Sequence, residues 1–319
     1  MGTVLVTGGA GFLGKYIARS LADAGDKVLI TYRRSFSTPR LLADIMESKV
    51  KAVRCDVTDL PELVRVIRDH GVDSIVHAAN ISNYEAPIYT CLQTNIAGTI
   101  NVLEAAAIGS VKKVTYISSS SIATSHGPDG SATEVESESV NIVSPPVGVV
   151  SPSKKVGEVM SLYYGATFGF QVAIVRPGLI YGPYGEGGVR NLKELREVME
   201  GVTAGKPVNL PDIGKDDPVG LVYVRDVGAC TALVHRAPKN QHRVYYIAED
   251  KPSSWKEIEA IVKESVPGAK ITFGKSSQPA RNRALPEKLN MLSEFGFKPK
   301  YGIREGLREL IEWYQSGRP

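Results

Sequence analysis

The chain has 319 residues, of which 43% are hydrophobic and 23% are charged, and its formal net charge is +4. This composition is typical of a globular protein with one large α/β unit or two smaller ones. So small a charge, without a Lys/Arg block, gives no electrostatic support for non-specific nucleic-acid binding.

The cysteines and the first residues indicate the compartment. Cys55, Cys91 and Cys230 are far apart and lack metal-ligand spacing, so we expect buried thiols and no metal site. A buried strand is expected at residues 3–7, with no charged leader before it, which is not the pattern of a signal peptide. No apolar run is long enough to span a bilayer. We therefore predict a cytoplasmic protein with no membrane partner.

Short apolar segments rich in β-branched residues alternate with amphipathic segments through the first half of the chain. Strands are expected at 4–7, 27–31, 51–55, 74–77, 113–118 and 171–176. Helices are expected at 12–24, 60–69, 89–108 and 154–168. Strands that are apolar on both faces and separated by helices predict an α/β fold, a Rossmann-type doubly wound parallel sheet. Such a sheet binds ligands at the carboxyl ends of its strands.

The pattern changes after residue 177, where Gly, Pro and Tyr become frequent. We expect a helix near 191–202, a strand at 221–224, and helices near 255–265 and 303–315, with Trp255 and Trp313 as packing anchors. This predicts a dinucleotide-binding domain over residues 1–176, with a return strand near 221–246. The remainder, 177–319, is expected to form mainly a smaller C-terminal α/β lobe that binds substrate.

A glycine-rich motif lies between the first strand and the first helix, Thr7-Gly8-Gly9-Ala10-Gly11-Phe12-Leu13-Gly14. Gly8 permits the tight turn, Gly11 lets the backbone approach a pyrophosphate, and Gly14 allows close packing of helix on strand. The amides of the helix N-terminus then face the anion. The strand–turn–helix context makes this a nucleotide-binding motif, with Phe12 and Leu13 among the contacts.

The end of the second strand decides the choice of cofactor. NAD-preferring sites carry an acidic residue there, whereas this chain has Tyr32, Arg33 and Arg34. Two guanidinium groups match the 2′-phosphate of NADP, although a purely solvated role for both remains an alternative. We therefore predict NADP, with NAD as the less favoured cofactor, and we expect Asp56 to meet the adenine amino group.

Further motifs follow in an ordered series along the chain. They are His77-Ala78-Ala79, Asn95-x-x-Gly98-Thr99, Arg176-Pro177-Gly178, Tyr181-Gly182-Pro183, Val222-Tyr223-Val224-Arg225-Asp226-Val227 and Phe295-Gly296-Phe297-Lys298-Pro299. In this order they resemble the extended short-chain dehydrogenases, the epimerase/dehydratase group. The resemblance covers nearly the whole chain and implies a homodimer. It also implies cofactor contacts from Val57, Ala78, Ala79, Lys154 and Pro177.

The chemistry of that family uses a Ser/Thr, a Tyr, and a Lys four residues after the Tyr. Ser120 and Lys154 match the first and last of these positions, with the register of Ser120 uncertain by one. Val150 stands at the tyrosine position, and no tyrosine lies between residues 116 and 163. Valine neither gives nor takes a proton, and a positioned proton donor typically contributes about 10² to 10⁴ in rate.

Three explanations of this departure stay open. In the first, another group or a water relay replaces the tyrosine, with Tyr84 the leading candidate and His126 and Tyr181 weaker ones. Alternatively, the substrate carries its own negative charge and needs little help. In the third, catalysis is lost and the chain is a non-catalytic NADP-binding sensor or scaffold.

The substrate pocket is expected to be apolar. Val219 stands where nucleotide-sugar members of the family carry a diphosphate-binding arginine, although Arg281 and Arg283 remain available later in the chain. We therefore expect an NADP-dependent ketone or aldehyde reductase, or an alcohol dehydrogenase, acting on a small apolar or aromatic substrate. The alternative enzyme is a nucleotide-sugar epimerase or dehydratase with tightly bound NAD.

Overall fold

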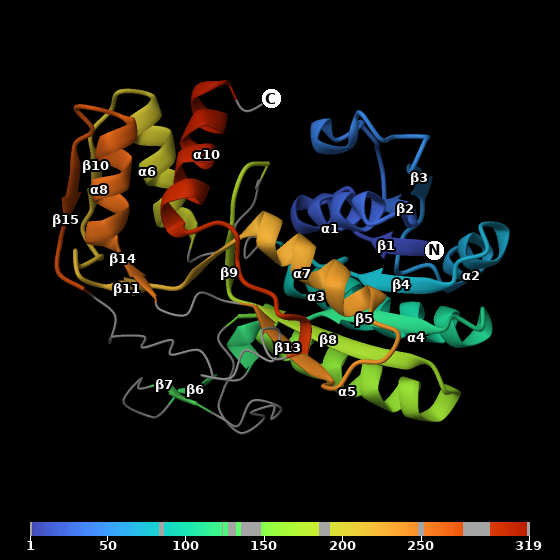
Figure 1. The fold of residues 1–319 in the computed structure, drawn as a ribbon. Helices are drawn as coiled ribbons and strands as arrows, with labels where there is room; N and C mark the ends of the chain where they lie inside the picture. The colour runs from blue at the N-terminus through green and yellow to red at the C-terminus, as the bar shows by residue number, and fades with distance from the viewer. Residues whose placement is uncertain are drawn as a thin grey trace.

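The computed structural model describes residues 2–82, 86–122, 124–126, 132–134, 148–184, 192–247, 252–276 and 294–317. These residues form one large sheet of seven parallel strands (Figure 1). The strands are β1 (Thr3–Thr7), β2 (Lys27–Tyr32), β3 (Val50–Arg54), β4 (Ser74–His77), β5 (Lys113–Ile117), β8 (Gln171–Pro177) and β13 (Val244–Ile247). Their order is β13-β8-β5-β4-β1-β2-β3, which confirms the expected Rossmann-type doubly wound sheet.

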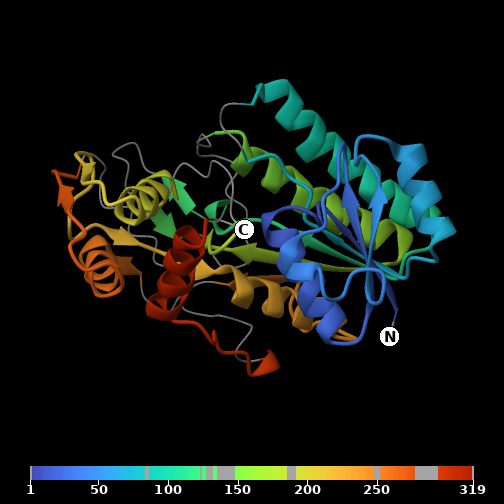
Figure 2. The same ribbon diagram turned by 90° about the horizontal axis from the view of Figure 1, so that it is seen from above.

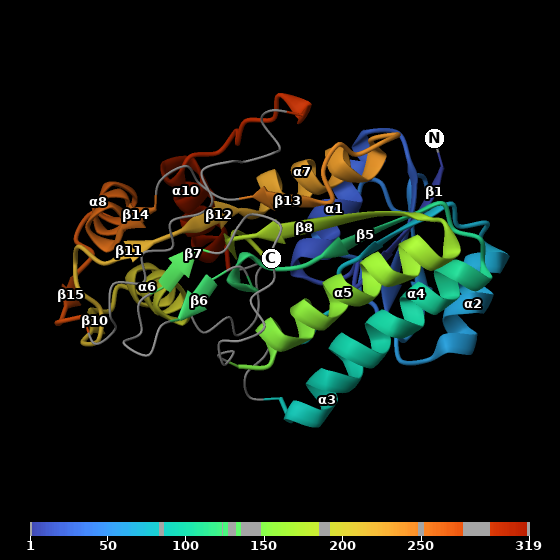
Figure 3. The ribbon, with the colours of Figure 1, turned by 90° about the horizontal axis from the view of Figure 1, so that it is seen from below.

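Helices cover both faces of this sheet (Figures 1 and 3). On one face α1 (Phe12–Asp23) packs beside α7 (Val224–Arg236), and on the other lie α2 (Leu60–Asp69), α4 (Gly98–Ile108) and α5 (Val150–Phe168). Side chains alternate between the two cores, because Val4 and Val6 of β1 pack under α1 whereas Leu5 packs under α2 and α4. Strands buried on both faces therefore explain the continuous apolar runs in the sequence.

A second lobe lies to one side of the large sheet (Figures 1 and 2). It contains α6 (Lys193–Thr203), α8 (Trp255–Ser265) and α10 (Ile303–Gln315), around a core that includes Trp255 and Trp313. Its strands form short pairs: β9 (Leu179–Tyr181) with β12 (Leu221–Tyr223), β10 (Val208–Leu210) with β15 (Ile271–Phe273), and β11 (Pro218–Val219) with β14 (Ser253–Ser254). The chain returns to the large sheet at β13. The division at residue 176 itself stays a prediction.

Three helical segments differ from the sequence-based expectation. Val224 ends no strand but begins α7, a helix that was not expected. The expected helix 154–168 begins earlier, at Val150. The expected helix 89–108 is interrupted, because α3 (Ile88–Leu92) runs into a π-helical turn, η2 (Gln93–Ala97), before α4.

The three cysteines are free and buried. In the described part of the chain, every helix is too short or too polar to cross a membrane.

Two further short elements, β6 (Thr124–His126) and β7 (Ala132–Glu134), form an antiparallel pair after the 3-10 turn η3 (Ser120–Ile122).

Candidate functional site

The glycine-rich turn between β1 and α1 has the geometry that close approach of a ligand requires. Gly8 has a φ of +67°, and a Cβ there would lie 2.8 Å from the Cα of Ala79. A Cβ on Gly14 would lie 2.1 Å from the Gly8 carbonyl oxygen, so α1 packs directly against the turn. The Gly8 amide donates to Thr31 Oγ1 over 3.0 Å. Thr31 therefore ties the turn to β2, a role that the sequence did not reveal.

Helix α1 presents its N-terminus beside this turn. It begins at Phe12 after Gly11, and no side chain caps it, so its first amides are available to an anion. The Phe12 ring packs edge-on against Tyr16, with centroids 6.3 Å apart, and Leu13 packs against the core under α1. Phe12 and Leu13 therefore bring their backbone to the site and direct their side chains to packing.

The end of β4 lies against the glycine turn. The Ala78 amide donates to the Thr7 carbonyl over 3.2 Å, and Thr7 Oγ1 bonds to His77 Nδ1 over 2.6 Å. The other ring nitrogen of His77 bonds to Thr99 Oγ1 over 2.9 Å. Burial lowers the pKa of His77 to about 3, so the ring is neutral. His77 is thus a packed residue that braces Ala78 and Ala79.

The end of β2 carries the two arginines predicted to select the cofactor. Arg33 and Arg34 are exposed, and neither is paired with an acid among the described residues. Tyr32 packs instead against Phe36, with ring centroids 5.1 Å apart. The two guanidinium groups are therefore accessible to an anion beside the glycine turn.

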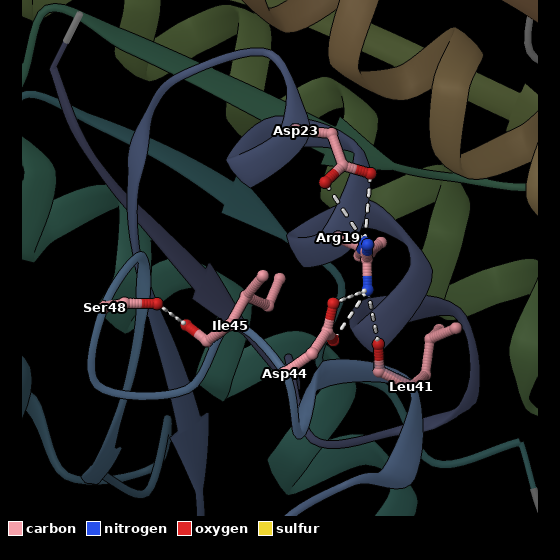
Figure 4. A network of polar contacts seen from close by, with 6 residues as sticks. All are labelled: Arg19, Asp23, Leu41, Asp44, Ile45 and Ser48. Atoms are coloured by element: carbon pink, nitrogen blue, oxygen red, sulfur yellow. Dashed lines mark hydrogen bonds and ion pairs between the residues drawn. The ribbon is translucent and has the colours of Figure 1, made fainter.

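The segment that follows these arginines is fastened to α1 by Arg19 (Figure 4). Arg19 Nε donates to Asp23 Oδ2 over 3.0 Å, and its Nη1 donates to Asp44 Oδ1 over 2.8 Å and to the Leu41 carbonyl over 3.2 Å. Leu41 belongs to the 3-10 turn η1 (Arg40–Leu42). The far end of the loop after β2 is thus held by a polar network rather than by packing alone.

The end of β3 supplies Asp56 and Val57. Asp56 Oδ1 accepts from the Thr58 amide over 3.0 Å, and the Asp56 amide donates to Glu62 over 2.8 Å. Val57 fits against Gly98, where a Cβ would lie 2.7 Å from Val57 Cγ2. These contacts orient the half-exposed Asp56 carboxylate at the carboxyl edge of the sheet, one strand beyond Arg33.

Ser120 and Lys154 both lie near the end of β5. Lys154 on α5 donates from Nζ to the Ile117 carbonyl, the last residue of β5, over 2.7 Å. Ser120 lies three residues further on in η3, which packs against α5. Burial lowers the pKa of the Lys154 amine to about 7, and the charge of Glu158 offsets part of that shift. Pro177 ends β8, the neighbouring strand.

Of the three side chains proposed to replace the tyrosine, the structure describes only that of Tyr181. Tyr84, Arg281 and Arg283 lie outside the described residues, as does the side chain of His126. Tyr181 is buried, packs on Tyr223 with centroids 5.3 Å apart, and donates to the Ile303 carbonyl over 3.5 Å. Tyr181 is therefore a packing residue of the second lobe.

The residues present fit a dinucleotide. The glycine turn forms a cradle that side chains would fill, as the close approaches at Gly8 and Gly14 show. Among the described residues, Ser118 Oγ and Asn80 Oδ1 are buried without a hydrogen-bond partner, and both follow strands at the carboxyl edge. Buried polar atoms of this kind call for a polar partner, which the ribose and carboxamide groups of a dinucleotide supply.

Glycine turn, uncapped helix and strand-end side chains together define a Rossmann-type dinucleotide-binding protein. The chain belongs to the NAD-dependent epimerase/dehydratase family, whose model matches residues 4–248.

Known proteins resemble the whole chain. A UDP-glucuronate 4-epimerase of Thermodesulfobacterium geofontis is 23% identical over 326 residues, covering 98% of this chain and 96% of that protein. The structure of UDP-glucose 4-epimerase from Thermus thermophilus with NAD has a TM-score of 0.77 at 23% identity, covering 98% of this chain and 99% of that one. UDP-N-acetylglucosamine 4-epimerase from Methanobrevibacter ruminantium, with UDP-N-acetylmuramic acid, has a TM-score of 0.81 at 20% identity, covering 99% of each chain. Structural likeness at such identity establishes the fold.

Proposed function

We propose that the chain is a nucleotide-sugar epimerase or dehydratase, which moves a hydride between a sugar carbon and a bound dinucleotide. The full-length similarity to a nucleotide-sugar epimerase carries this proposal, because it spans 98% of the chain and so includes the substrate lobe. The relatives thus favour this reading over the reductase of apolar carbonyls that the sequence alone suggested.

Residues at several strand ends have specific roles in the proposed function. The N-terminus of α1, with Gly8 and Gly11, holds the pyrophosphate, and Asp56 meets the adenine. When bound, the dinucleotide accepts and returns a hydride. Ser120 polarises the reacting oxygen, and Lys154 holds the ribose beside it.

The proposed cofactor is NADP rather than NAD. Arg33 and Arg34 stand exposed at the β2 position where NAD-preferring sites carry an acid. Each guanidinium offers charge-assisted hydrogen bonds to a 2′-phosphate. The family description names NAD, and the structure from Thermus thermophilus contains it, so NAD is the alternative cofactor to be tested.

A second candidate is an NADP-dependent reductase or alcohol dehydrogenase for a small apolar substrate. Val150 and Val219 favour it, since each replaces a polar side chain of the nucleotide-sugar enzymes. Val219 is buried in the core of the second lobe. A non-catalytic NADP-binding sensor is the third outcome to be tested.

Two measurements on the purified protein separate these functions. The first identifies the nucleotide released on denaturation and compares the dissociation constants of NADPH and NADH. The second incubates the protein with UDP-hexoses, UDP-glucuronate and dTDP-glucose, follows the sugars by NMR, and tests aldehydes and ketones with NADPH. A changed sugar supports the proposal, whereas reduction of carbonyl compounds alone selects the second candidate. Binding of cofactor without any turnover selects the sensor.

A homodimer is also proposed. Val156, Val159 and Tyr163 lie three and four residues apart on α5, and all are exposed. This spacing places them on one face of the helix, which fits a self-complementary contact of two copies. A Val159→Glu variant is expected to halve the mass seen by light scattering.

A cytoplasmic location is proposed as well, because the three thiols are free and buried. Cell fractionation checks this location.

A further inference from the structure

The first turn of α5 brings Val150 and Lys154 to the same side of the helix. They are four residues apart, which is about one turn. The resemblance to the family places a phenol and an amine at these two positions, and this chain has only the amine. The proton that moves to or from the substrate oxygen therefore needs another carrier.

Lys154 has hydrogen-bonding capacity that the described residues do not use. Lys154 is 6% exposed, and its Nζ has one hydrogen-bond acceptor among the described residues, the Ile117 carbonyl, together with a cation–π contact to the Tyr116 ring, whose centroid is 5.1 Å away. An ammonium has three N–H donors, and buried donors are normally all satisfied. Two N–H groups at the carboxyl end of β5 thus have no hydrogen-bond acceptor among the described residues. One matches the ribose hydroxyl, and the other is left for the substrate oxygen.

The other titratable groups around Lys154 are committed elsewhere. From β4, His77 is neutral and has both ring nitrogens bonded. From β5, Tyr116 is buried, and burial raises the pKa of its phenol far above neutrality. From α5 and β8, Glu158 and Arg176 bond to each other over 2.6 Å. His77 and Tyr116 are therefore not placed to exchange a proton near neutral pH, and both carboxylate oxygens of Glu158 are bonded to Arg176.

Lys154 itself has the proton affinity that this task requires. Burial lowers the pKa of its amine to about 7, so amine and ammonium are both populated near neutral pH. A general acid or base is most efficient when its pKa lies near the working pH. The pKa of a lysine amine falls in this way because burial disfavours its charged form.

We infer that the Lys154 amine exchanges the proton with the substrate oxygen, in place of the absent phenol; this rests on the proposed hydride transfer. In the oxidative direction the carbinol C–H bond breaks and its hydride leaves for the oxidised nicotinamide. The O–H bond breaks with it, and that proton moves to the neutral Nζ, which becomes an ammonium. In the return step the carbonyl carbon accepts the hydride and its oxygen takes the proton back. Atoms and electrons then balance without any further reagent.

The first test needs no turnover. The Nζ of lysines is followed by ¹⁵N NMR against pH in the cofactor-free protein, and the Lys154 signal is assigned by its loss in Lys154→Arg. We expect Lys154 to titrate near pH 7. A Lys154 signal that titrates above pH 9 overturns the inference, whatever the protein turns over.

The second test separates proton transfer from charge. Lys154→Arg keeps the positive charge and the donors to Ile117 and the ribose, but arginine does not release a proton at neutral pH. We expect kcat to fall roughly 10² to 10⁴-fold, with the cofactor dissociation constant changed by less than about fivefold. Lys155→Arg makes the same chemical change at the next residue and is expected to keep kcat.

The outcomes distinguish the two proposals. A Lys154→Arg protein that keeps its kcat overturns the proton role alone, because an unchanged charge then suffices. Absence of turnover in the unaltered protein overturns the proposed function instead. The melting temperature of Lys154→Arg serves as the folding control, and Lys154→Gln replaces it where arginine does not fit.

Discussion

Glu158 and Arg176 form a bidentate ion pair in the interior, between α5 and β8. Arg176 Nε donates to Glu158 Oε1 over 2.8 Å, and Nη2 donates to Oε2 over 2.6 Å. Both side chains are almost completely buried, with 0% and 2% exposed. Arg176 also donates to the hydroxyl of Tyr246 on β13. The pair therefore fixes the helix that carries Lys154 to the sheet.

Glu158→Gln is expected to destabilise the fold by about 3–5 kcal/mol, because it leaves a buried guanidinium without its counter-ion. The free energy of unfolding in urea measures this loss. Glu197→Gln is the matched control, since the Lys193–Glu197 pair is exposed with atoms 3.5 Å apart. The control is expected to change stability by at most about 0.5 kcal/mol. Equal effects of the two variants would contradict the structural role of the buried pair.

Gly14→Ala is expected to weaken dinucleotide binding at least about tenfold, since each lost bond to a charged group costs about 1.5–3 kcal/mol. The added Cβ would lie 2.1 Å from the Gly8 carbonyl oxygen and would displace the turn. Fluorescence titration with NADPH measures the change. Gly220→Ala is the control, because nothing lies within 4 Å of a Cβ at that position. Unaltered affinity in Gly14→Ala would remove the turn from the nucleotide site.

Replacing both Arg33 and Arg34 with Ala is expected to weaken NADPH binding roughly 10 to 100-fold, from the loss of charge-assisted bonds. NADH has no 2′-phosphate, so its dissociation constant is expected to stay the same. Arg68→Ala removes an exposed charge from the last turn of α2, and this variant serves as the control. A parallel loss for both cofactors would show that the arginines do not discriminate between them.

His235→Gln is expected to flatten the acid limb of the stability profile. His235 bonds to Ser74 and Thr115 over 2.8 and 2.9 Å, and burial lowers its pKa to about 3. Below about pH 6.5, His235 therefore binds a proton in the unfolded chain but not in the folded chain. Stability from this group is complete above that pH, and falls by up to about 1.4 kcal/mol per pH unit toward pH 3. Urea unfolding at pH 6 and 4.5 tests this, and parallel slopes in the two proteins would refute it.

Val150→Tyr is expected to raise kcat about tenfold or more, since a positioned phenol is a good proton donor. Val150 is half-buried at the first residue of α5, one turn before Lys154. Val150→Phe adds the ring without the hydroxyl and is expected to give no gain. An equal rise in both variants would attribute the effect to packing.

Much of the fold is predictable from the sequence, because two-sided apolar strands and the glycine motif are local signals. The helix α7 is not predictable in this way. Its sequence contains Gly228, several valines and a threonine, all poor helix formers. The helix is stabilised by tertiary contact, since a Cβ on Gly228 would lie 2.8 Å from the Tyr16 carbonyl oxygen of α1.

The helix boundaries that differ have similar causes. No side chain caps α5 at Val149, so the sequence lacks a start signal before Lys154. The π-helical turn places Asn95 where its amide bonds to the Ile81 backbone, accepting over 2.7 Å and donating over 2.9 Å. Tertiary contacts such as these are absent from any sequence window.

The candidate site is likewise predictable from the sequence only in part. Gly8, Gly14 and Lys154 are found by motif and spacing, and the structure brings them to one edge of the sheet. The bond from Lys154 to Ile117 joins residues 37 positions apart, and no pattern predicts it. Thr31 was missed for the same reason, because its hydroxyl serves the turn from a neighbouring strand.

The network around Arg19 separates two tasks within one loop. Asp44 and Leu41 hold the loop to α1, whereas Arg33 and Arg34 contribute no ion pair to the described fold. Under the proposed function, exchanging those two side chains alters which cofactor the loop recognises and leaves its attachment to α1 intact. Cofactor preference in such a protein is free to drift during evolution, or to be redesigned, while the scaffold keeps its stability.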